Sequence, residues 1–400
     1  VFLPLSGDLS ATIPFRRVMT TVEPASDHEG PPPEALLPSF RVTDVERDDD
    51  RLIYYGRPQT EYQRLEQQLW PLFREYGYEV RLDVVSDSEP DPITGVAVTE
   101  DRQALVAEPR SVGVDSVPWT NVVMFVATVL TTLYAGTIWY YEPVNGPLDL
   151  LAGWPFSLAV LGVLGVHEFG HYALSRHHDV QATLPYFIPL PNVLGTLGAV
   201  IRMKDHLPSR TALFDIGVAG PLAGLVATVV VTAVGVSLPP IEVGSDALIQ
   251  QVELGYPPLI QAVAAILGEP LVYDDPSLMV NPVVLGGWVG AFVTFLNLLP
   301  VGQLDGAHVT RALIGDRLDR FQLVVPVILF AIAGWLLVFG DSRAVALWVL
   351  WGVLALVLSR IGGARPIDES NVDRKRKVIG AVTLVVGLLC FTPAPIVFTG

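Results

Sequence analysis

The sequence predicts a polytopic α-helical membrane protein of about seven spans, with a re-entrant β element and a small N-terminal α+β soluble domain. Two observations predict this class. The chain of 400 residues is 51% hydrophobic, and its apolar residues gather in long runs. Each run approaches the roughly 20 residues that a helix needs to cross a bilayer. A polar stretch with mixed strand and helix patterns precedes the first of these runs.

The charge balance excludes one class of partner. The net charge is -16, and Lys204, Lys375 and Lys377 are the only lysines. A large acidic surplus with little lysine fits a halophilic surface, because net charge keeps a protein soluble; a merely acidic soluble domain is the alternative. An acidic surface argues against nucleic acid as a partner. Cys390 is the only cysteine, so a disulfide within the chain and a cysteine zinc site are both excluded.

The polar part is expected to divide into two segments. Residues 1–34 show no periodicity and are predicted to be disordered, with Val1 or Met19 as the true start. Residues 35–112 are predicted to form a compact β-α-β-β domain with no catalytic constellation. Alternation and helical spacing predict its elements, with a loop at 86–95: strands at 51–56, 79–85 and 104–109, and a helix at 61–78.

Residues 113–400 are expected to form the membrane domain. The apolar runs predict spans near 119–141, 149–175, 211–236, 282–301, 321–340, 344–361 and 378–398. The stretch 184–203 is apolar but is broken by three prolines, so it is a poor spanning helix. Its LGTLGAVI segment is expected to be a short strand pair or a re-entrant loop packed against protein.

Charge placement predicts the orientation. Fourteen Lys and Arg follow residue 113, and thirteen of them fall on one side of the predicted membrane if the N-terminal domain is cytoplasmic. Only Arg343 falls outside. This positive-inside bias predicts a multi-pass protein of the cell membrane, with the N-terminal domain and the active-site side in the cytoplasm.

The second predicted span contains three ionisable groups in H-E-x-x-H. His167 and His171 are four residues apart, so both imidazoles can face one metal from one side of a helix. Glu168 points beside that metal without being a ligand, as in sites where zinc activates water and Glu takes the proton. Histidines that only hydrogen-bond between helices are the alternative. Ionisable groups in a span are costly and usually functional, which favours the zinc site.

Catalytic zinc needs a third protein ligand and an open position. Asp305, in FLNLLPVGQLDGAH at the end of the fourth predicted span, is the candidate. Pro300, Gly302 and Gly306 interrupt regular helix around it, and an unwound segment could aim the carboxylate inward. Both spans run toward the cytoplasm, so the two motifs are expected at similar depth.

The paired motifs resemble the signatures of the site-2 protease family of intramembrane zinc metalloproteases. HEFGH and NLLPVGQLDG are similar to the family's HExxH and NxxPxxxLDG, and FDIGVAGPLAG resembles its Gly-Pro element. These features cover residues 149–310, and the acidic N-terminal unit looks more like archaeal and chloroplast-type members. The resemblance implies one zinc ion bound by His167, His171 and Asp305. It also implies Glu168 as the base and Asn297 as a residue that positions or polarises the scissile peptide.

The expected function is therefore intramembrane zinc endoproteolysis, in regulated intramembrane proteolysis. The expected partners are single-span membrane proteins as substrates and the lipid bilayer; the sequence carries no signal of oligomeric state. A divalent-metal transporter and a catalytically inactive scaffold are the alternatives. A transporter would use midplane carboxylates and histidines, often in internal repeats, and no repeat is visible.

Other residues near the motifs are given plainer roles. His177 and His178 are expected to contact water or headgroups, and Asp215 to be a carboxylate tolerated near a helix N-terminus. His308 is expected either to support the metal ligands or to be an ordinary interfacial histidine. Small residues of the Gly-Pro element, Gly220 and Gly224 among them, are expected to permit close helix packing.

Overall fold

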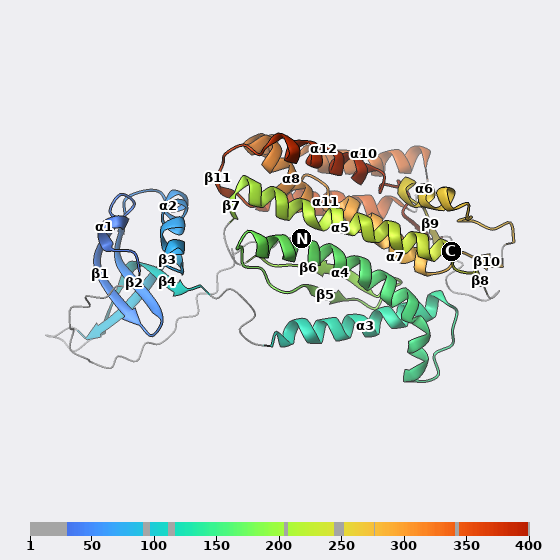
Figure 1. Ribbon diagram of the computed structural model, residues 1–400, viewed down its shortest axis with the longest axis horizontal. Helices are drawn as coiled ribbons and strands as arrows, with labels where there is room; N and C mark the ends of the chain where they lie inside the picture. Colours follow the sequence, from blue (N-terminus) through green and yellow to red (C-terminus); the bar gives the residue numbers. More distant parts are fainter. Residues whose placement is uncertain are drawn as a thin grey trace. The chain divides into compact units, whose positions relative to one another are not determined.

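The computed structural model describes residues 30–90, 97–110, 117–203, 207–243, 252–275, 277–340 and 344–398. The chain divides into two compact units, one over residues 7–115 and the other over residues 116–400. Each unit has its own core and is described separately below (Figure 1). The expectation of disorder for residues 1–34 falls almost wholly outside the described residues.

The N-terminal unit is an antiparallel sheet packed on a helix. Its strands lie in the order β1-β2-β4-β3. Leu65, Leu69 and Phe73 recur at helical spacing on α2 and are buried, and they form one core with sheet residues such as Tyr54. The elements are α1 (Pro33–Leu36), β1 (Phe40–Asp48), β2 (Arg51–Pro58), α2 (Tyr62–Glu75), β3 (Tyr78–Pro90) and β4 (Ala97–Pro109).

This sheet is larger than the sequence predicts. The strands and helix expected from the patterns are present as β2, α2, β3 and β4, but β1 was not predicted. β1 is an edge strand that buries few side chains, so it has no apolar alternation. The loop expected at 86–95 is also wrong over its first half, because β3 continues through Pro90 and pairs with β4.

The second unit is built mainly of helices. They are α3 (Trp119–Trp139), the 3-10 helix η1 (Pro147–Gly153), α4 (Trp154–His177), α5 (Arg210–Ser237), α6 (Pro258–Leu267), α7 (Val283–Asn297), α8 (Asp305–Ile314), the 3-10 helix η3 (Gly315–Arg317), α9 (Leu318–Phe321), α10 (Val324–Phe339), α11 (Val345–Ile361) and α12 (Arg374–Leu388). α5 runs through the middle and packs against both α4 and α7 (Figure 1).

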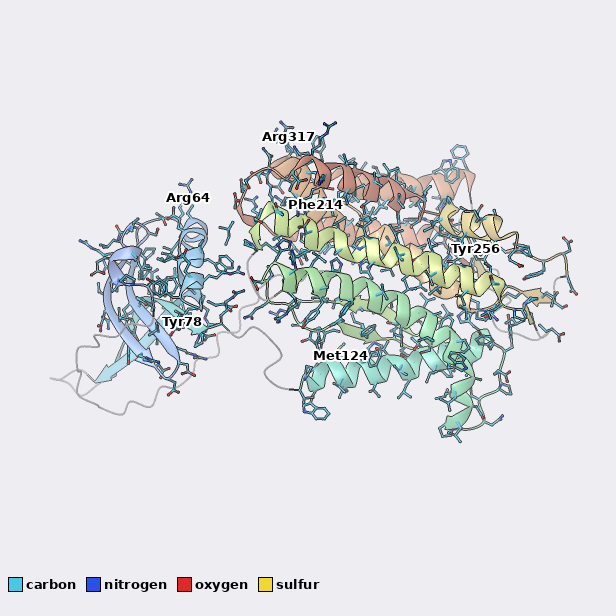
Figure 2. All side chains as sticks on the ribbon, in the orientation of Figure 1. Arg64, Tyr78, Met124, Phe214, Tyr256 and Arg317 are labelled. Atoms are coloured by element: carbon cyan, nitrogen blue, oxygen red, sulfur yellow. The ribbon has the colours of Figure 1, made fainter. Side chains whose placement is uncertain are left out.

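Short strands complete this unit. They are β5 (Tyr186–Pro189), β6 (Thr196–Val200), β7 (Leu207–Ser209), β8 (Ile241–Glu242), β9 (Val252–Leu254), β10 (Leu278–Met279), β11 (Pro366–Asp368) and β12 (Ile396–Phe398). β7 and β11 pair at the end where α5 begins, whereas β8 pairs with β10 and β9 with β12 near the opposite end (Figure 1). Figure 2 labels Phe214, near the start of α5, and Tyr256, which shortly precedes α6.

Helix length supports three membrane spans, or four. Within the described residues, α3, η1 with α4, and α5 are long and apolar enough to cross a membrane. The bent pair formed by α8–α9 and α10, with an angle of 66°, would be a fourth. Helices also lie at the other expected places, but α7 has 15 residues, α11 has 17 and α12 has 15. The expected count of about seven spans therefore does not follow from helix length.

A hairpin of β5 and β6 lies between α3 and α4 (Figure 1). The segment LGTLGAVI is expected to be a short strand pair or a re-entrant loop packed against protein. It supplies β6, and the partner strand comes from Tyr186–Pro189. Side chains of α3 hold this hairpin by hydrogen bonds to its main chain. Asn121 donates to Leu184 O and Pro185 O, Thr131 donates to Gly195 O, and Trp139 donates to Val193 O.

Candidate metal centre

α4 carries the two histidines of the H-E-x-x-H motif on one buried face. His167 is 2% exposed and His171 is 1% exposed. Their Nε2 atoms lie 3.3 Å apart. A spacing of four residues brings the two rings to the same side of the helix, as expected from 3.6 residues per turn. The pair can therefore offer two nitrogen ligands to one ion.

The third ligand atom comes from the first residue of α8. Asp305 is fully buried, and its Oδ2 lies 3.2 Å from Nε2 of His167 and 3.2 Å from Nε2 of His171. A carboxylate at the first position of a helix is favoured by the helix dipole. The structure thus brings His167, His171 and Asp305 together, with one ligand atom from each within 4.8 Å of the others.

The segment between α7 and α8 explains how Asp305 reaches the histidines. Pro300 cannot donate a main-chain hydrogen bond, so regular helix does not continue past α7. Gly302 has a φ of 59°, which glycine adopts without strain. At Gly306, a Cβ would lie 2.0 Å from Leu298 O, so only glycine allows the start of α8 to approach the end of α7. This close approach sets the carboxylate of Asp305 against α4.

A main-chain carbonyl of α5 orients the second histidine. Nδ1 of His171 lies 2.8 Å from Ile216 O. A carbonyl can only accept, so Nδ1 carries the proton and Nε2 is left with a free lone pair. This is the tautomer that a metal ligand needs, and such a second contact commonly fixes the ring of a metal-bound histidine. No sequence pattern signals this contact, because the acceptor is a backbone atom of another helix.

The donor set fits a divalent cation such as zinc. Two imidazole nitrogens and a carboxylate are the ligands that catalytic zinc takes, with a fourth position left for water. Among the described residues, Oδ1 of Asp305 and Oε2 of Glu168 are buried and have no hydrogen-bond partner. Buried carboxylate oxygens without partners are costly unless a cation neutralises them. The residues present therefore suit one metal ion.

Two further motif residues lie beside the cluster. Glu168, next to His167 on α4, is 2% exposed. Asn297, the last residue of α7, has its Nδ2 3.4 Å from Nε2 of His167. An amide at this distance can donate a hydrogen bond to a group that approaches the metal. The structure thus places all five sequence-predicted site residues in one buried region formed by α4, α7 and α8.

The flanking histidines and Asp215 lie outside the cluster. His308 is buried on α8 but is not among the three ligand residues. His178 follows α4, and its Nε2 lies 3.0 Å from Oδ2 of Asp215. The plain role expected for Asp215 is therefore incomplete. Nε and Nη2 of Arg376 also donate to its two oxygens, each at 2.7 Å.

This Arg376–Asp215 pair joins α12 to α5 across 161 positions of sequence. A two-pronged guanidinium–carboxylate contact is among the strong hydrogen-bonded pairs in proteins. Asp215 directly precedes Ile216, whose carbonyl contacts His171. This contact could not be predicted, because nothing in the sequence indicates which acid an arginine so far away will meet.

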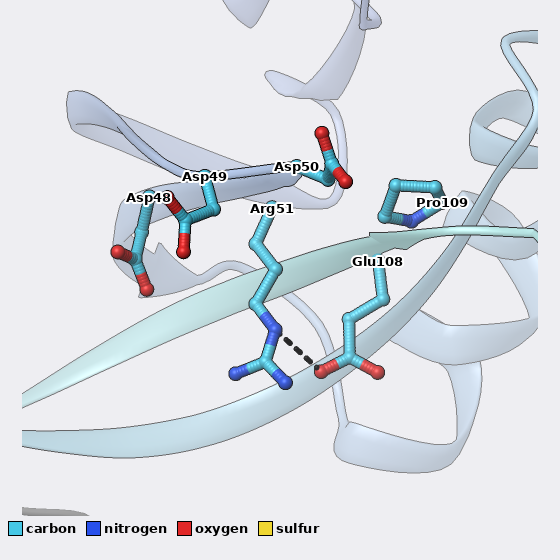
Figure 3. A pocket seen from close by; sticks show the side chains of 6 residues that line it. All are labelled: Asp48, Asp49, Asp50, Arg51, Glu108 and Pro109. Atoms are coloured by element: carbon cyan, nitrogen blue, oxygen red, sulfur yellow. Dashed lines mark ion pairs between the residues drawn. The ribbon is translucent and has the colours of Figure 1, made fainter.

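An open depression in the N-terminal unit is not lined by a ligand set like that of the metal centre. It is lined by Asp48, Asp49, Asp50, Arg51, Glu108 and Pro109 (Figure 3). Nε of Arg51 lies 3.2 Å from Oε1 of Glu108, so the arginine is engaged with a carboxylate. Asp49 and Asp50 form the β1–β2 turn and are exposed, whereas Asp48 is the last residue of β1 and is half-buried.

Comparison with known proteins agrees with this site. Residues 155–338 match the family described as peptidase family M50. The chain is 28% identical to "Probable zinc metalloprotease EGY2, chloroplastic" of Arabidopsis thaliana over 86% of its length and 60% of that relative. It is 32% identical to "Probable zinc metalloprotease EGY1, chloroplastic" of the same plant, over 60% of the chain and 43% of the relative.

A third relative is "Probable zinc metalloprotease EGY3, chloroplastic" of Oryza sativa subsp. japonica, 26% identical over 89% of the chain and 62% of the relative. The chain thus spans less than two thirds of the length of each of these relatives. No solved structure matches the chain.

Proposed function

We propose that this chain is an intramembrane zinc metalloendopeptidase. The premise is that residues 155–338 form a domain of peptidase family M50, the site-2 protease family. One observation carries the proposal. Two imidazole nitrogens and a carboxylate oxygen converge on one point, with the unpaired Oε2 of Glu168 beside them, inside helices apolar enough for a membrane. His167, His171 and Asp305 are the proposed ligands of one zinc ion.

The chain's own residues would then divide the work of peptide hydrolysis. A zinc ion held by the three ligands would polarise the scissile carbonyl and lower the pKa of a water molecule. Glu168 takes the proton from the attacking water and passes it to the leaving amide nitrogen. Asn297 donates its amide to the scissile peptide and keeps it in line. Burial of the carboxylates strengthens each of these electrostatic contacts, because the local dielectric is low.

The β5–β6 hairpin supports a way to bind an unwound substrate. A helical substrate hides its carbonyls in i to i-4 bonds, so it has to open before cleavage. Among the described residues β6 pairs only with β5, so its other edge remains available to an extended peptide. Leu197 is 65% exposed on this strand. Single-span membrane proteins are the proposed substrates, cleaved in or near their membrane segment in regulated intramembrane proteolysis.

Membrane placement is part of the same proposal. We propose that α7, α11 and α12 also cross the bilayer. Together with α3, η1–α4, α5 and the bent pair of α8–α9 and α10, they make about seven spans. The thirteen Lys and Arg that fall on one side of this arrangement support a cytoplasmic N-terminal unit and a cytoplasmic end for α4, in a protein of the cell membrane. The lipid bilayer is the remaining proposed partner.

The test replaces Glu168 by glutamine. Purified protein in liposomes with a single-span test substrate should cleave it, and Glu168→Gln should lower the rate by about 10²–10⁴-fold while zinc content stays at one per chain. Glu269→Gln, an exposed glutamate near α6, is the matched control and should cleave normally. Cleavage by Glu168→Gln at the original rate would refute the proposal. Zinc flux without cleavage by the unaltered protein would indicate a transporter instead.

A further inference from the structure

One face of α5 carries no side chains where it meets the buried histidines. Gly217, Gly220 and Gly224 lie at i, i+3 and i+7, which is one stripe of a helix. A stripe of small residues usually lets two helix backbones approach each other. The neighbours of Gly220 and Gly224 show a different use.

At Gly220 the space of a side chain is filled by a metal ligand. A Cβ on Gly220 would lie 2.0 Å from Nε2, 2.4 Å from Cδ2 and 2.4 Å from Cε1 of His171. All three of its nearest atoms belong to the imidazole. At Gly224 a Cβ would lie 2.7 Å from Nδ1 and 3.3 Å from Cβ and Cγ of His167. Each ligand ring therefore rests on a glycine of α5.

Other glycines of the unit show what backbone packing looks like. A Cβ on Gly170 of α4 would meet Ala219 O of α5 at 2.6 Å, and one on Gly235 would meet Val284 N of α7 at 2.6 Å. Their first contacts are main-chain atoms of a neighbouring helix. Gly220 and Gly224 instead face side-chain rings, so their role is separable from helix packing.

We propose that Gly220 and Gly224 are positioning residues of the metal centre, which set the two imidazoles by leaving room for them on α5. Gly220 carries the larger share. Contacts below 3.0 Å are essentially absent for real Cβ atoms, so a methyl group on Gly220 requires Nε2 of His171 and α5 to move apart by about 1.0 Å. Metal-ligand distances tolerate only about 0.2 Å. On Gly224 the required shift of the His167 ring is about 0.3 Å, close to this tolerance.

Contacts on both sides of the His171 ring keep it from moving aside to make room for a methyl group. Nδ1 of His171 is tied to Ile216 O of the same helix, and Nε2 faces both His167 and Asp305. Moving the ring away from α5 breaks the first contact and moves Nε2 out of the cluster. The inference concerns the metal ligands that the proposed function uses, but it can be tested without proteolysis.

The experiment measures metal binding by purified full-length protein. Zinc affinity and the visible absorption of the cobalt-substituted protein are compared for Gly220→Ala, Gly224→Ala and two controls. Gly220→Ala should weaken zinc binding by about 100-fold or more and alter the cobalt spectrum, and Gly224→Ala should weaken it by about tenfold. Gly162→Ala, on an open face of α4 with nothing within 4 Å, should bind zinc within about twofold of the unaltered protein.

Gly235→Ala separates imidazole positioning from packing. It is on α5 but meets the backbone of α7 far from the cluster, so it should lower the melting temperature and leave the cobalt spectrum unchanged. An unchanged spectrum and affinity in Gly220→Ala and Gly224→Ala would overturn the inference. So would an equal loss of zinc in Gly235→Ala. If Gly220→Ala cannot be purified, Gly224→Ala decides. Failure of the unaltered protein to bind zinc would refute the proposed function itself.

Discussion

Asp305 presents only one oxygen to the two histidines. Oδ2 is 3.2 Å from both Nε2 atoms, whereas Oδ1 is buried and has no partner among the described residues. This residue supplies the negative charge of the proposed ligand set, since both imidazoles are neutral when they bind a metal. Its charge, more than its shape, should therefore decide whether an ion stays bound.

Replacing Asp305 by asparagine tests this at nearly constant volume. Asp305→Asn should lower zinc affinity by about 10–100-fold or more, because a neutral amide oxygen is a weaker ligand for a cation. Asp274→Asn, an exposed aspartate, should bind zinc normally. The measurement is zinc content after dialysis against a graded chelator. Equal retention of zinc by both variants would show that Asp305 is not a ligand.

Among the site residues, the sequence predicts those contacts that local spacing along the chain determines. His167, Glu168 and His171 are close in sequence, so helix geometry alone brings them together, and Asp305 follows a helix break of recognisable type. The Ile216 carbonyl and the recess at Gly220 depend on which face of α5 meets α4. No pattern within either segment specifies that contact.

Among the elements, α12 is tied to α5 by charge as well as by packing. Arg376 donates to both oxygens of Asp215 and also contacts Asp373, the residue that caps α12. The first turn of α12 contains three further cations and no acid, which is unfavourable at a helix N-terminus. The contacts of Arg376 offset part of this cost and fix the start of α12 beside α5.

Removing this tie should loosen α12. Arg376→Ala should lower the free energy of unfolding by about 2 kcal/mol, since hydrogen bonds between charged groups contribute about 1.5–3 kcal/mol and this pair is partly exposed. Lys375→Ala removes the same charge from the neighbouring exposed position and should change stability by less than about 0.5 kcal/mol. Thermal unfolding in one detergent measures both variants. Equal losses would show that the pair contributes no specific stability.

Element positions were more predictable than element ends. Apolar runs locate the helices of the second unit, because burial in protein or lipid demands them. Their ends depend on particular breakers: α7 stops before Pro300, and α12 begins at Arg374, four residues before the expected span. β1 was missed because an edge strand with mostly exposed side chains has no period-2 signal.

In the second unit the basic residues Arg374 to Lys377 lie at the start of α12, whereas residues 237–281, which follow the end of α5, contain no Lys or Arg. α5 has 28 residues, about 42 Å, so its ends can lie on opposite sides of a bilayer core of roughly 30 Å. The start of α12 lies beside the start of α5, whereas α6 and the following loop come after its other end. Adaptation to high salt stays a prediction, as do the seven spans.

Labelling can test this orientation. In a Cys390→Ser background, which removes the only cysteine, single cysteines are introduced at Lys375 and at Val272, which is 78% exposed. In sealed vesicles a membrane-impermeant maleimide should label one position from outside and the other only after permeabilisation. Labelling of both from the same side would contradict the membrane placement proposed for α5.

The hydrogen bonds from α3 to the β5–β6 hairpin have a consequence for which residues of the hairpin can be replaced. Asn121, Thr131 and Trp139 all donate to main-chain oxygens, which every amino acid supplies. Exposed residues such as Leu197 can therefore be replaced without breaking the hydrogen bonds that hold the hairpin to α3. Under the role in substrate binding proposed for β6, randomising those positions would give a library of variants that share one scaffold and differ in the peptides they prefer.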